Sequence, residues 1–170
     1  MNKFNYEGII QIYLGDCFGA DNESNIKANK ITHVLSCMGS LSPKYKDTSI
    51  IQKKIELEDN EQTNIFKYFY ESIKFIENSN KVFVHCFAGV SRSATLVIAY
   101  FMWKKKMTFK ESLNFVSKFR IIGPNMGFRM QLLILEKKLK EANYDLDKIN
   151  WNDVVWPPVG GIKYNFNEIF

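Results

Sequence analysis

The side chains of this chain best suited to chemistry are a cysteine at residue 86 and an arginine at residue 92. They lie in the stretch His-Cys-Phe-Ala-Gly-Val-Ser-Arg-Ser, residues 85–93. The apolar run 82–85 before it predicts a buried strand, and the run 94–100 after it predicts the start of a helix. A loop between a strand and a helix N-terminus binds anions through its backbone N–H groups and the helix dipole. The sequence therefore predicts an anion-binding loop that carries a nucleophile.

The residue types in this loop suit the transfer of a phosphoryl group. A helix N-terminus and a nearby cation favour the thiolate form of cysteine, so we expect Cys86 to be the nucleophile. The planar guanidinium of Arg92 can bind two phosphoryl oxygens, and Gly89 lets the backbone turn and approach the anion. Ser93 is placed to help the sulfur depart, and His85 to orient the loop and support the thiolate. The backbone of the remaining loop residues is expected to contact the phosphate: Phe87, Ala88, Val90 and Ser91. The alternative is a buried structural cysteine between a strand and a helix.

The string His-Cys-x-x-Gly-x-x-Arg-Ser resembles the signature of the cysteine-dependent protein tyrosine phosphatases. Three further segments are similar to the small, atypical dual-specificity phosphatase domain: Ile-Tyr-Leu-Gly-Asp at 12–16, Ile-Thr-His-Val-Leu-Ser at 31–36 and Ile-Gly-Pro-Asn at 122–125. One departure is that Gln11 and Ile12 stand where that family usually has a proline. The resemblance implies hydrolysis of phosphotyrosine and phosphoserine or phosphothreonine in proteins, through a phospho-cysteine intermediate.

The resemblance also implies an aspartate that protonates the leaving oxygen, on a loop that follows a strand upstream of the cysteine. Asp59 fits this place, because it follows the predicted strand 50–57 and precedes the helical pattern of residues 64–77. Asp47 is the other candidate acid, and three further carboxylates lie nearby: Glu56, Glu58 and Glu61. Apart from catalysis, Asp59 could serve only as a favourable charge at a helix N-terminus. In similar phosphatases an asparagine at the place of Asn125 braces the phosphate loop, and it can also cap the helix that follows.

Strand and helix patterns alternate along the chain. Strands are predicted at 9–14, 31–36, 50–57 and 82–85, and helices at 24–30, at 64–77, from about 93, behind the capping box of Thr108 and Glu111, and at 126–140. This alternation predicts an α/β fold: a central, mainly parallel sheet flanked by helices, with the phosphate-binding loop between a central strand and a helix.

The last part of the chain differs from the rest. We expect residues 1–143 to form the dual-specificity phosphatase catalytic domain and residues 144–170 to form an aromatic C-terminal extension. The extension places aspartates between Trp151, Trp156 and other aromatic residues. Because large apolar side chains need burial, we expect it to pack on a folded domain, its own or a neighbour's, away from the mouth of the Cys86 loop.

Composition narrows the classes of partner. An apolar fraction of 46% excludes a disordered chain. Three cysteines and two histidines show no metal-binding spacing, so we expect no metal and no cofactor. The net charge of +5 attracts phosphorylated substrates, or it reflects only a lysine-rich surface; we expect no nucleic-acid partner.

No signal-peptide core or membrane span is evident, so we expect no membrane partner and a cytoplasmic, or also nuclear, location. A monomer, or a weak dimer through the extension, is expected.

Two other activities remain open from the sequence. A phosphoinositide or RNA 5′-phosphate phosphatase would use the same chemistry, but inositol-lipid members of the superfamily tend to carry lysines inside the loop, and this loop has none. A catalytically silent phosphate-binding module would be expected to lack the cysteine or the arginine, and both are present. Cys17 and Cys37 are expected to pack as small apolar residues rather than to form a regulatory disulfide with Cys86.

Overall fold

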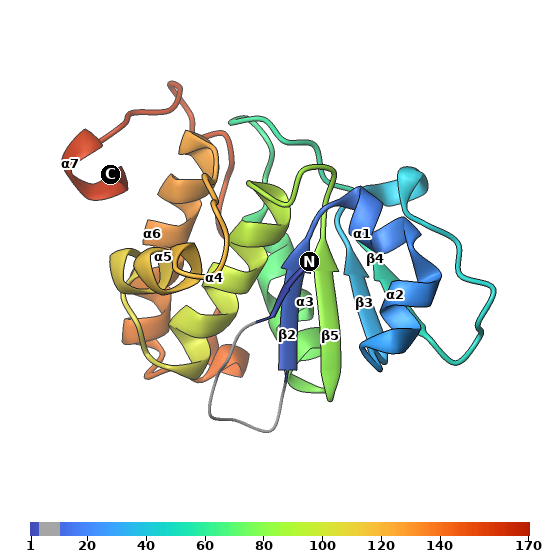
Figure 1. Cartoon of the computed structure of the whole chain (residues 1–170). Coiled ribbons are helices and arrows are strands. Elements are labelled where there is room, and N and C mark those ends of the chain that lie inside the picture. The colour runs from blue at the N-terminus through green and yellow to red at the C-terminus, as the bar shows by residue number, and fades with distance from the viewer. Residues whose placement is uncertain (4–10) are drawn as a thin grey trace.

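Four parallel strands form the centre of the structure, a computed structural model that describes residues 1–3 and 11–170. They are β2 (Gln11–Gly15), β3 (His33–Ser36), β4 (Ile51–Lys54) and β5 (Lys81–His85), and the short β1 (Asn2–Lys3) pairs antiparallel with β2. The order across the sheet is β1-β2-β5-β3-β4, so β5 is the middle strand (Figure 1). The predicted mainly parallel sheet is confirmed, while residues 9 and 10 of the predicted first strand lie outside the described residues.

The helices are α1 (Cys17–Asp21), α2 (Glu23–Ala28), α3 (Phe69–Glu77), α4 (Arg92–Lys104), α5 (Phe109–Ser117), α6 (Met126–Glu141) and α7 (Phe166–Ile169), with 3-10 turns at Gly39–Leu41, Phe66–Tyr68 and Leu146–Lys148. The five predicted helices appear in the predicted order with small shifts of their ends, while the short α1 and α7 were not predicted. The predicted helix 64–77 thus begins as a 3-10 turn and becomes α-helical only at Phe69. The predicted capping box of Thr108 and Glu111 is present at α5.

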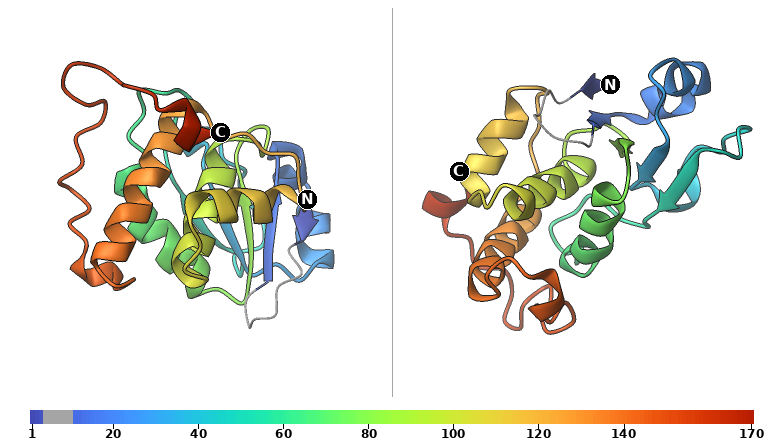
Figure 2. Two further views of the ribbon diagram at one scale, coloured as in Figure 1. Left: turned by 90° about the vertical axis from the view of Figure 1, so that its left-hand side faces the viewer. Right: turned by 90° about the horizontal axis from the view of Figure 1, so that it is seen from below.

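The two faces of the sheet are buried by different helices. Alternate residues of β2 and β5, among them Leu14 and Val84, join the large core beneath α3 and α4. Their neighbours Tyr13 and Phe83 face the smaller cluster that contains Ala20 of α1 and Ile26 of α2. The two layers of helices on either side of the sheet are visible in Figure 1 and, from below, in Figure 2 (right).

Helix α4 is the central helix of the domain. All residues from 93 to 102 are buried, because the sheet lies on one side and α3, α5 and α6 lie on the others. A helix enclosed in this way cannot shift without disturbing the whole core. Its N-terminus, at the end of β5, is therefore held in a fixed place, and this is where the anion-binding loop was predicted.

The C-terminal segment runs beside α6. Figure 2 (left) shows it rising along that helix and ending in α7. At its lower end the ring of Trp151 packs on Phe66, with 5.4 Å between centroids, and at its upper end Ile169 is fully buried. No helix within residues 1–3 and 11–170 combines the length and apolar character needed to cross a membrane.

Candidate active site

The sulfur of Cys86 lies at the bottom of the loop between β5 and α4, which we call the phosphate loop (residues 86–92). Only 2% of this residue is exposed. The backbone N–H of Gly89 donates to Sγ at 3.3 Å, and the Ser93 Oγ lies 3.1 Å from it. Both groups can donate a hydrogen bond to an anionic sulfur, so the loop is built to stabilise a thiolate in place.

Gly89 allows the loop to close against the end of β2. Its φ angle is +68°, and a Cβ atom at this position would lie 2.4 Å from the carbonyl oxygen of Gly15. No other residue type accepts both the backbone conformation and the contact. The close approach fixes the loop against the sheet at the point where the Gly89 N–H faces the sulfur.

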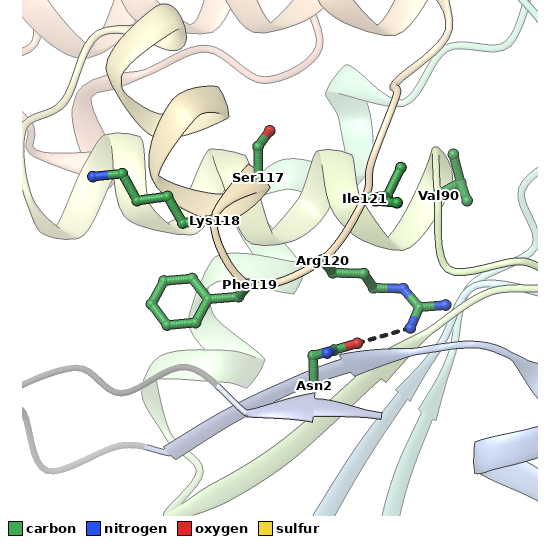
Figure 3. Close-up of a pocket in the computed structure, with 7 residues that line it drawn as sticks. All are labelled: Asn2, Val90, Ser117, Lys118, Phe119, Arg120 and Ile121. Carbon is green, nitrogen blue, oxygen red and sulfur yellow. Dashed lines mark hydrogen bonds between the residues drawn. The ribbon is translucent and has the colours of Figure 1, made fainter.

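Arg120 holds the phosphate loop from outside. Its Nε donates to the Gly89 carbonyl and its Nη2 to the Ala88 carbonyl, both at 3.0 Å. Its Nη1 donates to the Asn2 side chain at 2.9 Å, as Figure 3 shows, and the Asp16 carboxylate lies 3.5 Å away. Because the two carbonyls are held on the outside, the loop can direct N–H groups inward, as it does at Gly89.

Arg120 was missed in the sequence, although a signal for it exists there. The chain has 23 lysines and arginines, and only Arg92, Arg120 and Arg129 are arginines. Each of the three donates to backbone carbonyls of distant or neighbouring segments. In a lysine-rich chain an arginine therefore marks a place where the planar fork is needed.

Arg92 is the first residue of α4, and its guanidinium is only partly used. Its Nη1 donates to the carbonyl of Leu57 at 3.0 Å. Its Nε is buried and has no hydrogen-bond partner among the described residues. A buried donor without a partner costs roughly 1–3 kcal/mol. A phosphoryl oxygen above Cys86 would provide the missing acceptor.

His85 is fully buried directly before the nucleophile. The Ser36 Oγ lies 2.6 Å from its Nε2, and the Cys86 carbonyl lies 3.3 Å from its Nδ1. The Gln52 side-chain N–H donates to the Ser36 Oγ at 2.9 Å. The serine hydroxyl is thus left to donate its own proton to Nε2, and Nδ1 carries the ring proton toward the carbonyl.

The imidazole of His85 is neutral at physiological pH. Burial lowers its pKa to about 4, although the Cys86 carbonyl and the more distant carboxylates of Asp21 and Asp16 oppose the shift. A neutral ring can orient the loop through hydrogen bonds but cannot stabilise the thiolate with a charge. Sequence reasoning missed the supporting residues Ser36 and Gln52; the register that places Ser36 opposite His85 becomes visible only in the folded sheet.

Asp59 lies on an exposed turn beside the phosphate loop. We call residues 58–63 the acid turn. The Asn125 side-chain N–H donates to the Asp59 carboxylate at 2.9 Å, and the Asn125 backbone N–H donates to the Ser91 Oγ at 3.0 Å. The Asn125 side-chain oxygen accepts the N–H of Phe128 and so caps α6. One asparagine therefore joins the acid turn, the phosphate loop and a helix.

The alternative acid, Asp47, lies in a different environment. Its backbone N–H donates to the Glu23 carboxylate of α2, and its own carboxylate accepts the N–H and O–H of Ser49. The two bonds from Ser49 lower the pKa of Asp47, so this carboxyl group is less readily protonated than an ordinary aspartate. The structure brings Asp59, not Asp47, to the phosphate loop through Asn125.

The other cysteines are thiols that flank the site. Burial raises the pKa of Cys37 well above its usual range, and burial also raises that of Cys17. The Cys37 N–H donates to the His85 carbonyl, and the Cys17 N–H donates to the Phe87 carbonyl. Neither is in a disulfide. Their backbones hold the two residues on either side of Cys86, His85 and Phe87.

The side chains of the phosphate loop divide into two groups. Gly89 and Ser91 are buried, whereas Phe87, Ala88 and Val90 are exposed. The exposed fraction of Phe87 is 59%. The outer rim of the loop is thus apolar and without charge, while its inner surface consists of backbone and of the Cys86 and Arg92 side chains.

A comparison with protein families matches residues 12–138 to the dual specificity phosphatase catalytic domain. Dual specificity protein phosphatase 1 of Arabidopsis thaliana is 40% identical over 137 residues, which cover 78% of this chain and 69% of that protein. The protein-tyrosine-phosphatase MKP1 of the same plant is 38% identical over 133 residues, which cover 75% of this chain but only 17% of that longer protein.

A solved structure supports the same comparison. The crystal structure of DUSP15 superposes with a TM-score of 0.66 at 33% sequence identity, covering 76% of this chain and 90% of that one. The family match thus extends over the parallel strands, α4 and most of α6, which carry the site, and it ends before the C-terminal segment.

Proposed function

This chain belongs to the dual specificity phosphatase family and its domain is a protein phosphatase domain, and on that premise we propose how its residues act. Cys86 is the nucleophile, Arg92 binds the phosphoryl group, and Asp59 is the general acid. The substrates are proteins that carry phosphotyrosine, phosphoserine or phosphothreonine.

In the first step the Cys86 sulfur attacks phosphorus, and the bond between phosphorus and the ester oxygen breaks. Asp59 gives its proton to the leaving oxygen, which is then released as a neutral hydroxyl group. Arg92 and the backbone N–H groups of the phosphate loop bind the non-bridging oxygens, whose charge they stabilise in the transition state. The product is a phospho-cysteine.

In the second step water attacks the phospho-cysteine. The Asp59 carboxylate accepts a proton from the water, the sulfur–phosphorus bond breaks, and phosphate leaves. The Ser93 hydroxyl, 3.1 Å from the sulfur, stabilises the thiolate as it departs. Asp59 is protonated again and Cys86 is free for the next substrate.

One observation carries this proposal. The Gly89 N–H and the Ser93 hydroxyl converge on a single buried sulfur, and the unpaired Nε of Arg92 is buried in the same loop. A merely structural cysteine needs none of these donors. The loop is supplied with positive and polar groups for an anion that binds directly above the sulfur.

The proposal also covers the substrate class, the need for cofactors, the oligomeric state and the cellular compartment. The exposed loop residues carry no charge that would select a polyanionic inositol headgroup, which favours protein substrates. We propose catalysis without metal or cofactor, by a monomer or weak dimer, in a reducing compartment such as the cytoplasm or the nucleus, because Cys86 must stay reduced. Residues 1–143 are proposed as the catalytic domain and residues 144–170 as an extension of it.

The test uses two peptides of one sequence, one with phosphotyrosine and one with phosphothreonine, in the presence of EDTA. The full chain should release phosphate from both, and Cys86→Ser should retain less than about 1% of the rate, because serine in this loop is not ionised. Cys17→Ser is the matched control and should keep its activity. A Cys86→Ser variant that still turns over would contradict the covalent mechanism. Release of phosphate only from phosphoinositide vesicles, or only from 5′-phosphorylated RNA, would mean that the substrate is that lipid or RNA and not a protein.

A further inference from the structure

The acid turn is a compact unit. The Asn60 side-chain oxygen accepts the N–H of Gln62 at 2.9 Å, and the N–H of Thr63 donates to the Asn60 carbonyl at 3.2 Å. Asp59 therefore stands directly before a tight turn that contains Glu61. Whatever fixes the position of Glu61 also limits where the Asp59 carboxyl can be.

Helix α6 holds the inner side of this turn. A Cβ atom at Gly127 would lie 2.2 Å from the Glu61 carbonyl oxygen, so the turn rests directly on the helix backbone. The buried side chain of Gln131 donates to the Thr63 carbonyl at 3.0 Å and accepts the N–H groups of Ile65 and Phe66. These residues fall within the segment that matches the family.

The C-terminal segment holds the outer side. The Trp156 indole N–H donates to the Glu61 carbonyl at 2.8 Å, and the Tyr164 hydroxyl donates to the Glu61 carboxylate. The bond to Glu61 raises the pKa of Tyr164 to about 12, so its hydroxyl stays a donor through the neutral and mildly basic range. Both residues lie beyond residue 138, where the family match ends.

The segment that provides these two donors is anchored at both of its ends. Before Trp156, Trp151 packs on Phe66 and Tyr70. After Tyr164, the Arg129 guanidinium donates to the carbonyl of Ile169 at 2.9 Å. Figure 2 (left) shows the chain between these anchors lying outside α6. A segment fixed at both ends can transmit a constraint to what lies beneath it.

We propose that residues 151–170 form a strap that holds the acid turn in place for catalysis, and that Trp156 and Tyr164 are positioning residues for Asp59. This rests on the proposed role of Asp59 as general acid. The strap completes the fixation that Asn125 begins: Asn125 binds the Asp59 carboxylate, while Trp156 and Tyr164 bind Glu61 two residues later.

The test compares kcat/KM on two substrates that differ in the leaving group. Nitrophenol leaves p-nitrophenyl phosphate readily as an anion, whereas phenol needs the proton of the general acid. Tyr164→Phe and Trp156→Phe should each lower kcat/KM on phenyl phosphate by about 3–10-fold, part of the gain from general acid catalysis, and by less than about twofold on p-nitrophenyl phosphate. Both substitutions keep an aromatic ring, so the fold should be retained, as a thermal melt would show.

Tyr70→Phe is the matched control. It also removes a hydroxyl that donates to a carboxylate of the C-terminal extension, at 3.0 Å to Asp147, but that bond involves neither Asp59 nor Glu61 and lies outside the strap, while the ring that packs on Trp151 is kept. It should change kcat/KM by less than about twofold on either substrate. An equal loss from Tyr70→Phe would show a general effect of loosening the segment and would overturn the proposal.

The decisive measurement is made in the Asp59→Asn variant. If Tyr164 acts through Asp59, adding Tyr164→Phe to Asp59→Asn should lower kcat/KM on phenyl phosphate by no more than about twofold further. A further loss equal to that in the wild type would overturn the strap. If Asp59→Asn lowers kcat/KM on phenyl phosphate but Tyr164→Phe alone does not, the role of the strap is contradicted and the role of Asp59 as general acid is kept. If Asp59→Asn itself equals the wild type, the acid is wrong and the strap with it.

Discussion

The phosphate loop and the acid turn are held by opposite means. The phosphate loop is enclosed by the sheet and by a helix whose residues 93–102 are all buried, and its sulfur is reached by donors three and seven positions away in sequence. The acid turn lies at the surface and depends on Asn125, Trp156 and Tyr164, which are between 66 and 103 positions away. The site of the proposed nucleophile is therefore built by the core itself, whereas the position of the proposed acid is set by remote contacts that can change separately.

The sharpest test of this contrast is the removal of the acid. Asp59→Asn should lower kcat/KM on phenyl phosphate by about 10²–10⁴-fold, because phenolate then leaves without a proton. The unfolding free energy should hardly change, since Asp59 is exposed. Steady-state kinetics and a denaturant titration measure the two quantities.

Asp47→Asn is the matched control for that experiment and should keep its kcat/KM. If the loss followed Asp47 instead, the acid would have been assigned to the wrong carboxylate. A large fall in stability with Asp59→Asn would show that the acid turn supports the fold, against the contrast drawn here.

The second test measures how the unfolding free energy depends on pH, and it reports on His85, next to the phosphate loop. The pKa of His85 is lowered to about 4 in the folded protein, from about 6.5 in an unfolded chain. The unfolded chain binds more protons between these values, so the unfolding free energy should fall as the pH drops through this window. The total fall from this group is about 3 kcal/mol.

Denaturant titrations between pH 6.5 and 4.5 measure this fall before most carboxylates are protonated. In His85→Gln that part of the pH dependence should disappear, while any contribution of His33 remains in both proteins. An identical slope in the wild type and in His85→Gln would mean that His85 is not buried in its neutral form.

The third test separates the two chemical steps. Ser93→Ala should lower kcat by about 10-fold, since the sulfur leaves phospho-cysteine without a hydrogen bond. Its kcat/KM should change little, because the first step does not need that hydroxyl. Rapid mixing should show a burst of product followed by slow turnover, with Ser117→Ala as the control on the surface of α5. A parallel fall of kcat and kcat/KM without a burst would place Ser93 in the first step.

The contrast also explains how much of the site could be predicted. The phosphate loop is encoded in nine consecutive residues between a strand and a helix, so its place at the end of the middle strand could be predicted from the sequence. Asp59 could be proposed only by its place between a strand and a helix. Apart from Ser93 and Asn125, the partners of both regions could not be predicted: Ser36 meets His85 through sheet register, Arg120 binds loop carbonyls, and Trp156 meets Glu61 across 95 positions.

The fold itself was more predictable than its edges. Alternating strand and helix patterns gave the parallel sheet and the order of the helices. The antiparallel strand β1 was not predicted, because two residues, Asn2 and Lys3, are too short for a periodic pattern. The helix predicted from residue 64 begins as a 3-10 turn at Phe66–Tyr68, where the distant Gln131 accepts the N–H groups of Ile65 and Phe66.

The indole of Trp156 is a natural fluorescent probe of the acid turn. The chain has three tryptophans; Trp103 and Trp151 donate to the carbonyls of Tyr144 and Leu146, while Trp156 donates to Glu61. In a protein in which Trp103 and Trp151 are replaced by phenylalanine, all tryptophan fluorescence would come from Trp156, and it can be excited at a wavelength that the eight tyrosines do not absorb. Its emission wavelength and its quenching by small solutes would then follow the acid turn as substrate binds and leaves, without any attached dye.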